Sequence, residues 1–371
     1  MRDPNAPDRV RSFAFFVIAA LYFFFAQIVA GRAANGLVSG EWYLLVERGM
    51  LLFLLVVGYG AMGRAFQGQR RPIEAMGLVF RPGWRREFGR GAALGWGMLI
   101  VSIFPMVLAG GLIVTIWTNP RQWLLLFLDL FVLAIASLAE EVAFRGYPFQ
   151  RLIESIGPFL ATLLLSAIFG AVHLSNPSAS AASITITVFA GWLLSIAYLR
   201  TRALWFSWGW HFAWNVSMGV IFGLPISGLT RFSPVVQSNT VGPVWLTGGN
   251  YGPEGSIIAA IVLLAGLVVV SVLTRRDAPE PAQPAVPLAG GAVETVSSFS
   301  PGEQAESLPL RRPTQQWEEN SHPLTSGAGP ENPPPAPETK ISASHSQESP
   351  ASPPADGLSP ASGTEDAHPL V

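Results

Sequence analysis

The sequence predicts an all-α, polytopic membrane helix bundle with a disordered C-terminal tail. Of its 371 residues 50% are hydrophobic and only 13% are charged, which is about half the charged fraction of a typical soluble domain. Apolar runs long enough to cross a bilayer recur between residues 12 and 274. Beyond them, a stretch with more than half of the 31 prolines and few aromatic residues cannot bury enough surface to fold. We therefore expect a membrane domain at 1–276 and a disordered tail at 277–371.

Eight apolar runs have about the length of a membrane-spanning helix. They cover Ser12–Gly31, Tyr43–Met62, Gly91–Trp117, Trp123–Ile153, Gly157–Leu174, Ala181–Leu199, Ala203–Leu224 and Ser256–Thr274. The fourth run is too long for a simple span, so we expect it to project from the membrane or to break near residues 140–146.

The distribution of arginine predicts the orientation of these helices. The loop between the second and third runs is the most basic, with Arg64, Arg70, Arg71, Arg81, Arg85, Arg86 and Arg90. Loops of this kind stay in the cytoplasm, which also places the N-terminus and the tail there and predicts a multi-pass protein of the cell membrane. Arginine replaces lysine almost throughout, a bias that suggests a bacterial, GC-rich genome. The net charge of −1 gives no reason to expect a nucleic-acid partner.

Several polar side chains interrupt the central runs. They are Glu140, Glu141, Arg145, His173, His211 and Asn215. One charge at membrane depth costs roughly 2.5–3.5 kcal/mol. Each residue alone could be a contact between helices, as we expect for Glu47 with Arg48 and for Asp129. If the fourth and fifth runs form a hairpin, however, Glu140 and His173 lie about 3 Å apart in depth. Six such residues at compatible depth indicate a site.

The chemistry that these residue types support is the attack of water on an amide. Two adjacent carboxylates in a low-dielectric environment resist being ionised together, so one can act as a base and the other as a structural anion. A histidine facing the base can orient the water, and a second histidine with Asn215 can donate hydrogen bonds to an oxyanion. A metal held by Glu140, His173 and His211 is a less favoured alternative, because the His-Glu-x-x-His pattern is absent.

Three motifs resemble the type II CAAX prenyl protease and bacteriocin-processing (CPBP, Abi) intramembrane proteases. The family patterns Glu-Glu-x-x-x-Arg, Phe-x-x-x-His and His-x-x-x-Asn occur here in order between residues 123 and 224. They fall on Glu140–Arg145, Phe169–His173 and His211–Asn215. The resemblance implies a peptidase in which Glu140 and His173 activate water. It also implies that His211 and Asn215 stabilise the oxyanion and that Glu141 and Arg145 support the site.

The expected partners are the lipid bilayer and a peptide or membrane-protein substrate, whether CAAX-like or not. We expect a glutamate-type endopeptidase without a cofactor, with zinc or another divalent metal as the alternative. Two other functions fit the same residues: a non-catalytic scaffold or bacteriocin-immunity protein that retains the motif, and, with less support, a transporter. No clear pair of duplicated helices favours the transporter.

Overall fold

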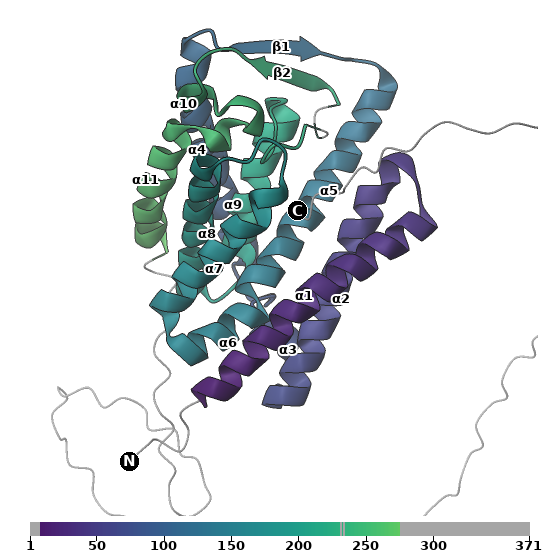
Figure 1. Ribbon diagram of the computed structural model, residues 1–371, viewed down its shortest axis with the longest axis vertical. Coiled ribbons are helices and arrows are strands. Elements are labelled where there is room, and N and C mark those ends of the chain that lie inside the picture. Colours follow the sequence, from purple (N-terminus) through teal and green to yellow (C-terminus); the bar gives the residue numbers. More distant parts are fainter. Residues whose placement is uncertain (1–7, 231, 233, 275–371) are drawn as a thin grey trace, which may run out of the picture. The chain divides into compact units, whose positions relative to one another are not determined.

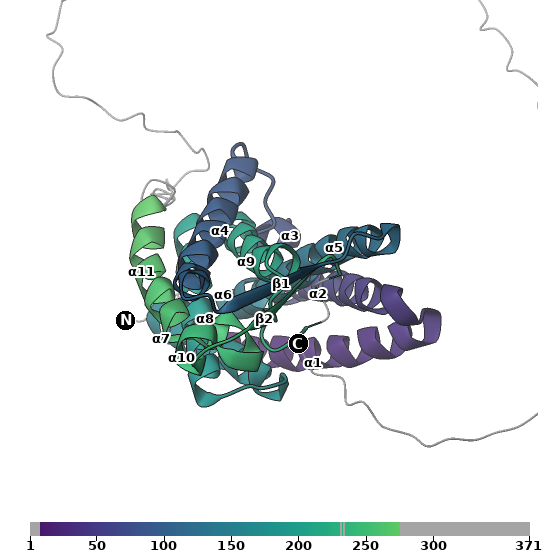
Figure 2. The same ribbon diagram turned by 90° about the horizontal axis from the view of Figure 1, so that it is seen from above.

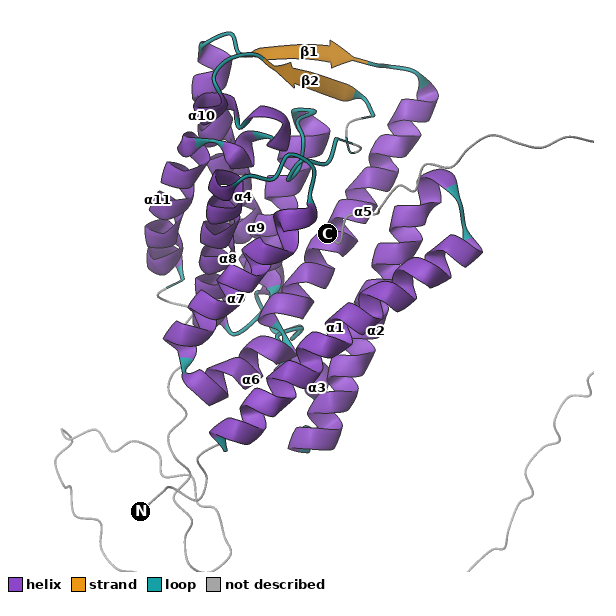
Figure 3. Cartoon of the chain, viewed as in Figure 1, coloured by secondary structure: helices purple, strands orange, loops and turns teal. Residues whose placement is uncertain are grey.

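A computed structural model describes residues 8–230, 232 and 234–274 of the chain. They form a predominantly helical bundle (Figure 1), and strands are confined to one short pair (Figure 3). This confirms the predicted fold class. The tail predicted at 277–371 lies outside the described residues.

Six helical segments in the described part are long and apolar enough to cross a membrane. They comprise α1 (Arg9–Leu37), α2 (Tyr43–Gln67), α4 (Trp84–Leu108), α5 (Pro120–Arg145) with α6 (Tyr147–Ile156), α7 (Pro158–Val172) with the turn after it, and α8 (Ala181–Thr201). A multi-pass membrane protein is thereby indicated. The short helices α3 (Pro72–Ala75) and α10 (Val244–Thr247) lie in connecting segments.

The eight predicted spans are not confirmed, because the last two are short. The seventh contains α9 (Trp205–Val216), which continues into a π-helix at Ser217–Ile221. The eighth is α11 (Ile257–Leu273), an apolar helix of 17 residues.

The end of the third predicted span is wrong. Helix α4 ends at Leu108, and Gly110 then adopts a left-handed φ of 66° that glycine tolerates best. The β-branched run that follows is β1 (Leu112–Ile116), which pairs antiparallel with β2 (Val236–Thr240). Figure 2 shows this strand pair lying across one end of the bundle.

Helix α5 breaks directly after the Glu-Glu-x-x-x-Arg motif, which is one of the two alternatives expected for this long run. Gly146 separates α5 from α6 with φ −76° and ψ −131°. A Cβ atom at this position would lie 2.4 Å from the carbonyl oxygen of Val142, so only glycine fits the turn. The break ends α5 immediately after Arg145, and α6 leads away to α7.

The motif on α5 lies between two apolar clusters. One cluster is formed mainly by α4, α8, α9 and α11, and includes Val132 and Leu133 from α5. The other is formed mainly by α1, α2, α6 and α7, and includes Ala139 and Val142 from α5. Helix α5 therefore contributes to both clusters, which places Glu140 and Glu141 at their junction.

Glycine brings α9 into backbone contact with α4. A Cβ atom at Gly95 would lie 2.3 Å from the carbonyl oxygen of Trp210, and one at Gly209 would lie 2.2 Å from that of Phe88. Small residues four apart, such as Gly91 and Gly95, allow this approach in membrane helices. The contact fixes α9 at Gly209 and Trp210, immediately before His211.

Candidate active site

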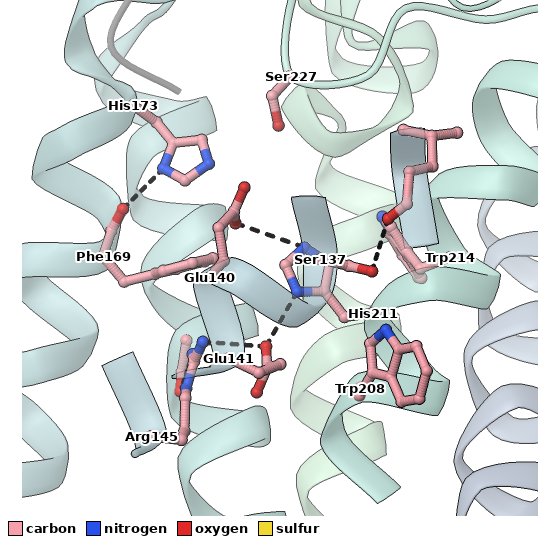
Figure 4. A network of polar contacts seen from close by, with 12 residues as sticks. Ser137, Glu140, Glu141, Arg145, Phe169, His173, Trp208, His211, Trp214 and Ser227 are labelled. Carbon is pink, nitrogen blue, oxygen red and sulfur yellow. Dashed lines mark hydrogen bonds and ion pairs between the residues drawn. The ribbon is translucent and has the colours of Figure 1, made fainter. Parts of the chain in front are cut away.

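The predicted site residues meet at one cavity of about 120 Å³ inside the bundle. Glu140 comes from α5, His173 from the turn that follows α7, and His211 and Asn215 from α9; all four line the cavity. In the view of Figure 4, the carboxylate of Glu140 lies between the rings of His173 and His211. The volume accommodates several water molecules.

A closed group of charges, which we call the inner network, lies behind the cavity. Arg145 Nη1 donates to Glu141 Oε1 at 3.2 Å, and Arg145 Nη2 donates to the carbonyl oxygen of Gly191 on α8 at 3.0 Å. The side chains of Glu141 and Arg145 are 0% and 1% exposed. His211 completes the network through Nδ1, which lies 2.9 Å from Glu141 Oε1.

His211 joins the inner network to the cavity. Its Nδ1 donates to Glu141, and its Nε2 lies 3.6 Å from Glu140 Oε2. From the sequence we expect His211 to act with Asn215, and His173 to face Glu140. In the described part of the chain, His211 is instead the histidine within ion-pair distance of Glu140. Because Nδ1 is a donor, Nε2 can donate to an oxyanion only when the ring carries both protons.

His173 is oriented by the backbone of its own helix. Its Nδ1 lies 2.7 Å from the carbonyl oxygen of Phe169, which can only accept, so Nδ1 carries the proton. In the neutral ring Nε2 is then unprotonated and available to accept a proton. We use the name open site for three residues that line the cavity and do not belong to the inner network: Glu140, His173 and Asn215.

Phe169 gives the Phe-x-x-x-His motif a structural explanation. Its ring packs 4.6 Å beneath the guanidinium of Arg145 and meets the ring of His211 edge-on at 6.2 Å. Its carbonyl oxygen orients His173. One residue therefore contacts both the inner network and the open site.

Two contributions to the cavity were not predicted. Glu254 accepts from Trp214 Nε1 at 2.9 Å and from the backbone and hydroxyl of Ser227 at 2.8 and 2.7 Å, so it ties the loop before α11 to α9. No sequence pattern marks it.

Glu47 and Arg48 on α2 make the expected local contact at 3.0 Å, but both also line the cavity. Asp129 does not line it.

Within residues 8–230, 232 and 234–274, no group of three or more His, Cys, Asp or Glu side chains is arranged to hold a metal ion. Glu140 and His211 approach each other, with Oε2 of Glu140 3.6 Å from Nε2 of His211, and Nδ1 of His173 contacts the carbonyl oxygen of Phe169. The alternative ligand set of Glu140, His173 and His211 stays a prediction.

Fold and site together define a class: polytopic helical membrane proteins with a carboxylate–histidine site inside the bundle. Residues 120–217, about a quarter of the chain, match the family model of Rce1-like type II CAAX prenyl endopeptidases. The match runs from the start of α5 to the end of α9 and contains all three motifs. This match confirms the predicted resemblance over residues 120–217 and supports a CAAX-type intramembrane protease family. No curated protein and no solved structure matches the chain.

Proposed function

We propose that this protein is an intramembrane endopeptidase that hydrolyses a peptide bond of a membrane-associated substrate. The observation that carries the proposal is the division between the inner network and the open site. Oε2 of Glu140 lies 3.6 Å from Nε2 of His211, and the Glu140 side chain is 16% exposed and lines the cavity. The side chain of Glu141, by contrast, is fully enclosed. Ionisable side chains inside a membrane-spanning bundle are costly to bury, and an accessible carboxylate beside a histidine there favours a functional site.

Glu140 and His173 activate the attacking water. Both line the cavity, and each presents a proton acceptor: a carboxylate oxygen of Glu140 and Nε2 of His173. A water held by both groups loses a proton as it attacks the substrate carbonyl, and the same proton is then delivered to the leaving amine. Exclusion of bulk water from the bundle strengthens these interactions.

His211 and Asn215 stabilise the tetrahedral oxyanion. They lie four residues apart on α9 and both line the cavity. The doubly protonated ring of His211 donates from Nε2, and the Asn215 amide supplies the second donor. Preorganised donors of this kind contribute about 2.7–4 kcal/mol to a transition state. Glu141 supports the site by holding Nδ1 of His211.

The decisive variant is Glu140→Gln, tested on a peptide that the wild-type protein cleaves in a peptide-library screen. We expect kcat to fall by about 10²–10⁴-fold because the general base is lost, with unchanged thermal stability. Glu74→Gln, an exposed carboxylate on α3, is the matched control and should retain full activity. Full cleavage by Glu140→Gln would refute the glutamate mechanism. Rescue of a null strain by that inactive variant would favour a non-catalytic scaffold.

Metal dependence is measured with the same peptide in the presence of a chelator. The glutamate-type mechanism predicts an unchanged rate after dialysis against EDTA. A rate that falls and is restored by added zinc would establish the metal-dependent alternative.

A further inference from the structure

Helix α2 brings an arginine to the cavity from outside the family-matched segment. Arg48 lines the main cavity, and its side chain is only 12% exposed. It also borders a second, smaller cavity, whose walls again include Glu140 and His173. Arg48 is therefore close to the two groups proposed to activate water, although no family motif contains it.

The guanidinium of Arg48 has more donors than its surroundings use. Glu47 is its one ion-pair partner in the described part of the chain, through a 3.0 Å contact to Nε. A guanidinium carries five N–H donors in a planar fork, and a single neighbouring carboxylate cannot satisfy them. Donors left in a cavity wall can bind a group that enters the cavity.

The charges around the cavity indicate the kind of group that Arg48 receives. The acidic residues that line it are Glu47, Glu140 and Glu254, and Arg48 is the one arginine or lysine among the lining residues described. Three carboxylates would repel an anionic substrate. Arg48 provides a fixed positive charge beside them, and its forked guanidinium matches a carboxylate with two parallel hydrogen bonds.

We propose that Arg48 determines specificity by binding a carboxylate of the peptide substrate close to the scissile bond. The carboxylate comes either from the C-terminus of the substrate or from an aspartate or glutamate side chain near the cleavage point. Glu47 holds the guanidinium in place while the cavity is empty. This inference rests on the proposed peptidase function. Arg48 takes no part in proton transfer, since a guanidinium keeps its charge.

The test compares matched peptides that differ only in their carboxylates. One pair has a free or an amidated C-terminus, and the other has aspartate or asparagine beside the cleaved bond. For the wild-type protein we expect one neutral peptide to show a KM about tenfold higher or more than its acidic partner, since hydrogen bonds to charged groups are strong. The pair that shows the difference identifies the source of the carboxylate. Equal KM values within both pairs would overturn the proposal without any variant.

The variant Arg48→Gln should abolish this discrimination by raising KM for the acidic peptide, with kcat changed little. Arg48→Lys should restore part of it, because lysine keeps the charge but loses the fork. Arg32→Gln, an exposed arginine of α1, is the control. Carboxylate binding by Arg48 would be refuted if Arg48→Gln kept the wild-type difference in KM between the acidic and neutral peptides. A fall in kcat with unchanged KM would refute it as well. If Glu140→Gln is inactive at the same time, the peptidase function stands and only the role of Arg48 fails.

Discussion

Two adjacent carboxylates, Glu140 and Glu141, belong to two very different regions of the molecule. Glu141 lies in the inner network, fully enclosed and bound to Arg145 and His211, whereas Glu140 lines the open site with a side chain 16% exposed. Consecutive residues of a helix point about 100° apart, so one turns into the protein and the other into the cavity. The comparison teaches that one dipeptide can supply a fully enclosed carboxylate and an accessible one by orientation alone.

The strongest way to break the inner network is Arg145→Met. It leaves the carboxylate of Glu141 buried without its arginine, and breaking a buried pair in this way costs about 3–5 kcal/mol. We expect a large drop in the thermal unfolding temperature in detergent. Arg121→Met, which removes an exposed arginine paired with Glu41, should change it little. An unaltered unfolding temperature would mean that the network does not stabilise the fold.

His211→Ala tests the residue that both regions share. We expect kcat to fall by about 10²–10³-fold, the loss seen when one oxyanion donor is removed, with KM nearly unchanged. A smaller loss of stability should accompany it, because Glu141 keeps Arg145. An effect confined to KM would make His211 a substrate-binding residue instead.

Phe169→Leu should produce the smallest of these effects. The backbone carbonyl that orients His173 remains, but the ring beneath Arg145 is lost, and a desolvated cation–π contact is worth about 2 kcal/mol. We expect a moderate loss of stability with activity reduced only a few-fold. Loss of activity as large as that of Glu140→Gln would show that the ring itself acts in the open site.

Much of the helical fold can be predicted from the sequence, because hydropathy directly reports which segments can enter a bilayer. The prediction fails where apolar character does not distinguish helix from strand. Leu112–Ile116 is as apolar as the helix before it, and its pairing with Val236–Thr240 joins residues more than a hundred positions apart. A local pattern contains no information about that contact.

The site shows the same limit. Glu141 and Arg145 are four residues apart on α5 and contact each other, as this spacing allows, but spacing cannot reveal that His211 on another helix contacts Glu141. Nor can it distinguish Arg48, which contacts its neighbour Glu47 just as a surface pair would, from a residue in a cavity wall. The Phe-x-x-x-His motif predicts the place of His173 but not the carbonyl contact that sets its tautomer.

The glycine contact between α4 and α9 means that the family-matched segment packs closely against a helix outside it. Residues 120–217 include α9 but not α4, against whose backbone Gly209 packs. Excised alone, this segment would expose the strip of α9 that packs against α4. His211 would keep its contact with Glu141, which lies within the segment, but α9 would lose the contact that fixes it immediately before His211. The residues that we propose to be catalytic thus lie in one stretch of the chain, while part of the surface that positions α9 comes from another.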